Sequence, residues 1–172
     1  INIMIKRNNT LMLFLAYSLI IIVPIIISIA FCLSIDLPQN SPFIEEKNVL
    51  TIFIHNMLIG LLLITLTDIT AIPIIIINSF YLGIIIGSIM QSTNIEHLLF
   101  STIHIPFELI GWILILHFSR KFRFILFRLI KKERTNFKEL VTKVLVYLFP
   151  IYLIAAVIES LEIYLSLKGW CL

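Results

Sequence analysis

The chain has 172 residues, of which 60% are hydrophobic and 13% are charged, and at this length a single domain is expected. A mean hydropathy of +1.08 excludes an ordinary soluble globular protein. The net charge of +3 does not indicate nucleic-acid binding, because most basic residues lie in one segment beside an apolar run, as membrane topology requires. Cys32 and Cys171 are too few for a structural zinc site, and no disulfide is expected between them.

Five apolar runs predict an all-α, polytopic transmembrane helical bundle in one integral membrane domain. The runs do not show the alternation typical of a membrane β-barrel. The first follows Lys6 and Arg7 and contains Pro24 as a candidate kink. We expect it to remain uncleaved, because it is long for a signal peptide and lacks a small-x-small site. The predicted spans are residues 11–35, 49–66, 69–90, 97–118 and 144–167.

The connections between these runs fit helices that pack against each other in sequence. Residues 36–48 carry two prolines and net acidic charge, which predict a loop. Residues 67–70 are so few that the second and third helices must form a tight hairpin. The third helix presents Ser79, Gly83 and Gly87 at four-residue intervals, a small-residue face that favours packing within the chain over a homodimer seam.

Residues 119–143 contain nine of the 13 basic residues, interleaved with Phe and Ile. Two interpretations are open, an amphipathic helix lying on an anionic leaflet or a solvated cytoplasmic loop with a frayed helix end. With five spans, this segment and Lys6/Arg7 both lie on the cytoplasmic side, which places the N-terminus inside and the C-terminus outside. The candidates for contact with an ATPase or a lipid surface are Arg120, Lys121, Arg123, Arg128, Lys131 and Lys132.

An ionisable pair interrupts the fourth run. His104 and Glu108 are four residues apart, so a helix would place both on one face, with Pro106 between them. Proline cannot donate to the carbonyl of Thr102, so the helix is expected to be interrupted there. The pair could be metal ligands, a proton relay or a structural hydrogen bond. We favour the hydrogen bond, because two ligands are too few for a stable metal site and no cofactor is indicated.

A second carboxylate is expected inside the membrane, in the fifth helix. Ala155, Glu159 and Glu162 share one face, and Glu159 lies near the middle of the span. Glu159 must be protonated or partnered there, and His104, Asn56 and Asn78 are the candidate partners. We favour an interhelical polar clamp over a substrate or proton site. Glu162 is expected nearer the outer interface.

Four short motifs in this sequence resemble the motifs of one protein family. Asn56 matches an asparagine early in a second helix, and Asn78 with Gly83 and Gly87 approximates an Asn-Gly-x-x-x-Gly stretch in which Ser79 replaces a glycine. The run His104-Ile-Pro-Phe-Glu108 approximates a His-Gly-x-x-Glu motif with Ile105 in place of glycine. A small-residue run ending in Ile-Glu is matched by residues 155–159. Over about residues 49–165, the chain resembles the stage II sporulation protein M family of bacterial multi-pass membrane proteins.

The resemblance implies a bacterial cell-membrane protein without enzymatic activity. Some members of that family act in envelope remodelling, and others accompany ABC-type exporters and self-immunity to bacteriocin-like peptides. The small size favours the second group, so an export or immunity subunit is expected, with a cytoplasmic ATPase, a second copy of the chain or a peptide as partner. The alternatives are an envelope scaffold and a proton-coupled carrier that uses His104, Glu108 and Glu159.

Overall fold

The computed structural model describes residues 2–35, 48–92 and 95–168, and within these ranges every regular element is a helix. The prediction of an all-α fold is therefore confirmed. The elements are α1 (Asn2–Leu33), α2 (Val49–Thr65), α3 (Thr67–Ser92), α4 (Ile95–Ser101), α5 (Ile105–Ile130) and α6 (Phe137–Leu167).

Four segments are long and apolar enough to cross a membrane: Leu11–Leu33, Thr67–Gln91, Leu98–Ile130 and Phe137–Ser166. The fifth apolar helix, α2, has 17 residues and is shorter than a typical span. Large apolar side chains cover the outside of the helices, among them Leu19, Leu58, Ile77 and Leu161, each more than half exposed. An exterior of this kind is suited to lipid, and it is consistent with a multi-pass membrane protein.

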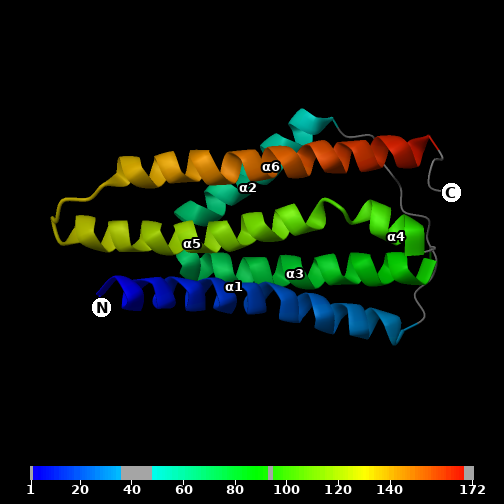
Figure 1. Ribbon diagram of the computed structural model, residues 1–172, viewed down its shortest axis with the longest axis horizontal. Coiled ribbons are helices and arrows are strands. Elements are labelled where there is room, and N and C mark those ends of the chain that lie inside the picture. Colours follow the sequence, from blue (N-terminus) through cyan, green and yellow to red (C-terminus); the bar gives the residue numbers. More distant parts are fainter. Residues whose placement is uncertain (1, 36–47, 93–94, 169–172) are drawn as a thin grey trace.

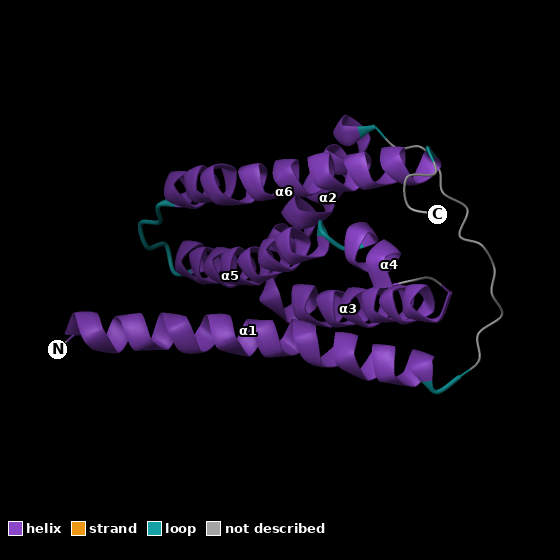
Figure 2. Cartoon of the chain, turned by 45° about the vertical axis from the view of Figure 1, so that its right-hand side comes forward, coloured by secondary structure: helices purple, strands orange, loops and turns teal. Residues whose placement is uncertain are grey.

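The long helices run roughly along one common axis (Figures 1 and 2). The α1 helix packs along α3, while α5 contacts α1, α2, α3 and α6 and so occupies the centre. The beginning of α1 and the α5–α6 connection lie at one end of the bundle, and the end of α6 lies at the other (Figure 1). The two basic segments of the sequence therefore belong to the same end.

The small-residue face of α3 packs against α1 inside the chain. A Cβ atom added at Gly83 would lie 1.9 Å from Ser28 Oγ and 2.5 Å from the carbonyl oxygen of Ile25, so the two backbones approach closely only because Gly83 has no side chain. A Cβ at Gly87 would lie 2.7 Å from Cys32 Cβ. Cys32 is a buried free thiol, whereas Cys171 lies outside the described residues.

The predicted tight hairpin joins α2 and α3 through Leu66 alone. Thr67 has a φ of 67°, which turns the chain sharply into α3. The next residue, Asp68, is only 6% exposed and forms an ion pair with Arg123 of α5, with 2.8 Å between Arg123 Nε and Asp68 Oδ1. A second contact of 3.0 Å joins Arg123 Nη2 and Asp68 Oδ2. Only the Nη2–Oδ2 contact has hydrogen-bond geometry, and together with the ion pair it holds the hairpin against the central helix.

The helices on either side of the basic segment are longer than expected. The α5 helix continues to Ile130 and α6 begins at Phe137, so residues 119–143 form two helix ends and a short connection. The segment is therefore mostly helical, and the connection of residues 131–136 is short. The continuation has a physical cause, because Phe122 and Ile125 pack against the apolar core and Arg123 binds Asp68.

Candidate functional site

A break in the fourth apolar run lies where several ionisable side chains gather inside the bundle. The helix stops at Ser101 and a new helix starts at Ile105, with Pro106 in its first turn. The interruption expected at Pro106 is therefore present. Pro106 has no N–H to donate to the Thr102 carbonyl. That carbonyl accepts instead from the backbone N–H of Ile105 at 3.2 Å. The break lies in the half of the bundle nearer the end of α6 (Figure 1).

His104 sits at the N-terminal end of α5 and is held by Glu162 of α6. The backbone N–H of His104 donates to Glu162 Oε1 at 3.1 Å, and His104 Nδ1 lies 2.6 Å from Glu162 Oε2. The Glu162 carboxylate thus contacts both the backbone N–H at the start of α5 and the imidazole ring of His104. A helix N-terminus favours a negative charge, which makes this position suitable for a buried carboxylate. Glu162 is only 5% exposed.

Glu108 stands one turn further along α5 and faces α2. Its Oε1 atom accepts from Asn56 Nδ2 at 3.3 Å. Glu108 and Asn56 also border a cavity of about 110 Å³ that reaches between α2, α3, α5 and α6. The cavity could hold a few water molecules, since each occupies roughly 30 Å³ in the liquid. Its other lining residues are Ile59, Leu63, Asn78, Trp112, Ile115 and Tyr152.

Glu159 of α6 completes the group. One ligand atom from each of His104, Glu108 and Glu159 lies within 4.8 Å of the other two, and all three residues are partly buried. We refer to His104, Glu108, Glu159 and Glu162 as the polar cluster. It joins the start of α5 to α6, and through Asn56 it also reaches α2.

The sequence placed most of these residues together but assigned the contacts differently. His104 and Glu108 were expected to pair, yet His104 pairs with Glu162, and Glu108 takes Asn56 as its hydrogen-bond partner. Asn78 lines the cavity beside Glu108. Glu162 was expected nearer the interface, and its place in the cluster was missed. Its spacing of three residues from Glu159 was the available signal, because that spacing puts both carboxylates on one helix face.

The basic residues singled out in the sequence divide into two groups. Arg123 is engaged by Asp68, and Arg120 and Lys121 are partly buried beside Phe124 and Phe118. The second group is exposed on the projecting end of α5 and comprises Arg128, Lys131 and Lys132.

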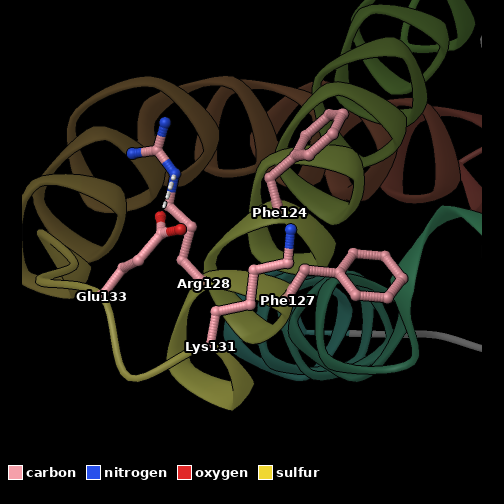
Figure 3. Close-up of a pocket in the computed structure, with 5 residues that line it drawn as sticks. All are labelled: Phe124, Phe127, Arg128, Lys131 and Glu133. Atoms are coloured by element: carbon pink, nitrogen blue, oxygen red, sulfur yellow. Dashed lines mark ion pairs between the residues drawn. The ribbon is translucent and has the colours of Figure 1, made fainter.

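A shallow pocket of about 350 Å³ lies on this projecting end, lined by Phe124, Phe127, Arg128, Lys131 and Glu133 (Figure 3). The Arg128 guanidinium and the Glu133 carboxylate face each other across one side, with 3.9 Å between Nε and Oε2. The two phenylalanines supply an apolar wall on the other side (Figure 3). The surface is therefore both basic and aromatic.

In comparisons with known proteins, the chain matches no family model, no curated protein and no solved structure. The resemblance to the stage II sporulation protein M family stays a prediction from the sequence.

Proposed function

We propose that this chain is a non-enzymatic membrane subunit of a bacterial export or self-immunity system for a bacteriocin-like peptide, and that it works with an ABC-type ATPase. The observation that supports this proposal best is the hairpin formed by the ends of α5 and α6. These ends extend past the α2–α3 turn (Figures 1 and 2). A helical hairpin that leaves the apolar bundle offers a docking surface for a cytoplasmic protein.

The chemistry of the hairpin suits an acidic partner with an apolar anchor. Arg128, Lys131 and Lys132 are exposed, and Phe127 is 52% exposed beside them. Arginine and aromatic side chains are enriched at the centres of protein interfaces. The sequence has no glycine-rich nucleotide-binding loop, so a partner subunit would bind and hydrolyse ATP.

The orientation follows from the same hairpin. In our proposal the basic hairpin and the N-terminus are cytoplasmic, and the end of α6 is outside. The polar cluster then lies nearer the outer face, because the α4–α5 break is in the half of the bundle that carries the end of α6 (Figure 1).

The test is purification of the tagged chain from its native membrane in mild detergent, followed by mass spectrometry. We expect a stoichiometric ATPase subunit with the wild type and its loss with Arg128→Glu/Lys131→Glu/Lys132→Glu. The control, Lys168→Glu, reverses an exposed charge at the opposite end and should retain the subunit. Recovery of the wild type alone or as a homo-oligomer contradicts the proposal and favours an envelope scaffold.

A second candidate, a proton-coupled carrier, is favoured by the polar cluster beside the 110 Å³ cavity. Ionisable side chains inside membrane helices commonly mark proton or substrate pathways. Glu108→Gln and Glu159→Gln separate the two candidates. Loss of function with normal assembly supports the carrier, whereas loss of assembly supports a clamp that holds the helices together.

A further inference from the structure

We propose that His104, Glu108 and Glu159 bind one divalent transition-metal ion, with Zn²⁺ as the best-suited ion, and that Glu162 positions His104 for it. This inference goes beyond the proposed function, because it holds whichever partner the chain takes. It reverses the expectation from the sequence, where only two ligands were in view. The fold brings Glu159 of α6 to His104, just before α5, and to Glu108 of α5, and so supplies the third ligand.

The distances between the ligand atoms suit a single ion. Since the three atoms lie within 4.8 Å of one another, a point between them lies no further than about 2.8 Å from each. Zinc binds nitrogen and carboxylate oxygen at roughly 2.0–2.2 Å, so side-chain shifts of less than about 1 Å would complete the contacts. The ligands come from two helices packed against each other, which gives them a rigid support.

Glu162 orients the histidine as a metal site requires. Histidines that bind metals commonly donate their second ring N–H to a carboxylate, which fixes the tautomer and makes the free nitrogen more basic. His104 Nδ1 is 2.6 Å from Glu162 Oε2, and in the neutral ring with its hydrogen on Nδ1 the lone pair for an ion would be on Nε2. The second carboxylate oxygen of Glu162 accepts from the backbone N–H of His104, which holds the carboxylate in place beside the ring.

Glu108 is supported in the same manner. Asn56 donates to Glu108 Oε1 at 3.3 Å, and hydrogen bonds to ligating carboxylates are common around metal ions. The cavity bordered by Glu108, Asn56 and Asn78 has room for a water molecule next to Glu108, one of the three proposed ligands. Three protein ligands with an open position form the usual arrangement of a zinc ion that binds an exchangeable ligand.

The ligand types narrow the choice of ion. One imidazole with two carboxylates suits zinc, manganese or ferrous iron, whereas calcium and magnesium prefer oxygen ligands alone. Neighbouring carboxylates in an apolar bundle are costly when ionised, and a divalent ion lowers that cost by neutralising them. The ion would therefore stabilise the packing of α5 on α6.

The experiment measures metal content in the purified full-length chain. Protein in detergent is equilibrated with Zn²⁺, dialysed against metal-free buffer and analysed by mass spectrometry of the metal. We expect one zinc per chain for the wild type and background levels for His104→Ala and Glu108→Gln. The matched controls are His55→Ala and Glu133→Gln, which remove an exposed histidine and an exposed glutamate and should retain the zinc.

Two further measurements distinguish loss of the metal ligands from misfolding of the variants. Glu162→Gln should weaken zinc binding about 10- to 100-fold without abolishing it, as expected for a residue that positions a ligand. Cobalt bound to the wild type should give visible d–d absorption without a thiolate charge-transfer band, which separates this site from a cysteine site. Zinc retained in His104→Ala and Glu108→Gln, or wild type without zinc and without the cobalt spectrum, would overturn the proposal.

Discussion

Glu162 binds His104 twice, through the backbone N–H at 3.1 Å and through ring Nδ1 at 2.6 Å. The contact joins the start of one helix to the last turns of another across 58 positions of the chain. A side chain that accepts from the free backbone N–H at the start of a neighbouring helix both caps that helix and joins the two helices. Four predictions follow the principal contacts of the fold.

The first concerns Glu162 itself. Glu162→Ala leaves the N–H and the ring of His104 without their acceptor, and we expect it to lower the free energy of unfolding by about 2–4 kcal/mol. Glu162→Gln keeps one carbonyl acceptor and should cost less. The measurement is unfolding of the detergent-solubilised chain by SDS, followed by circular dichroism. Glu133→Ala, at an exposed position, should change the midpoint little; equal effects of the two alanine variants would contradict the proposed role.

The second concerns the contact between α1 and α3. Gly83→Ala places a methyl group within 2.5 Å of the Ile25 carbonyl oxygen, so the helices must separate. We expect a loss of about 1–3 kcal/mol in the free energy of unfolding. Gly60→Ala is the matched control, because its added Cβ meets only side-chain atoms of Ile115 and Tyr152, the nearest at 3.2 Å. That variant should change stability by less than about 1 kcal/mol. Equal losses in both variants would argue against a close α1–α3 contact.

The third concerns the pair of Asp68 and Arg123. A double-mutant cycle with Asp68→Asn and Arg123→Gln should give a coupling energy of about 1–3 kcal/mol, because Asp68 is buried and its carboxylate accepts a hydrogen bond from the charged guanidinium. The exposed pair of Arg128 and Glu133, with 3.9 Å between Nε and Oε2, serves as the comparison. Its coupling should stay below about 0.5 kcal/mol. A coupling near zero for Asp68 and Arg123 would mean that the hairpin is held by apolar contacts alone.

The fourth concerns orientation in the membrane. Glu133→Cys on the basic hairpin and Asn48→Cys at the start of α2 are both exposed, and the proposed topology puts them on opposite sides. In a Cys171→Ser background, an impermeant maleimide applied to intact cells should label Cys at position 48 and not at position 133. Position 133 should react after permeabilisation. Labelling of position 133 in intact cells would require the inverted topology.

The helical fold could be read from the sequence because long apolar runs and the spacing of small residues are local features. The lengths of α5 and α6 could not be predicted from the sequence, because both helices continue through charged residues that tertiary contacts stabilise. Phe122 packs against the core, and Arg123 donates a hydrogen bond to Asp68, which lies 55 positions away in the sequence. Helix ends depend on such distant contacts as much as on local composition.

The polar cluster illustrates the same limit. The four-residue spacing identified His104 and Glu108 as neighbours, and both belong to the cluster. The spacing holds although His104 precedes the first residue of α5, because the His104 carbonyl accepts from the N–H of Glu108 at 3.3 Å. The face that carries both residues meets α6, and there Glu162 is the partner of His104. Spacing along one helix shows which residues share a face, but not which helix that face meets.

The division of contacts along the chain gives the molecule an order of assembly. Every residue of the contact between α1 and α3 has been synthesised by Ser92, so this half can be complete while translation continues. The contact of His104 with Glu162, by contrast, can form only after Glu162 has been synthesised, a few residues before α6 ends at Leu167. Formation of the cluster is therefore a late event of biogenesis, and a chain truncated after α5 would carry its histidine into the bilayer without the carboxylate that holds it.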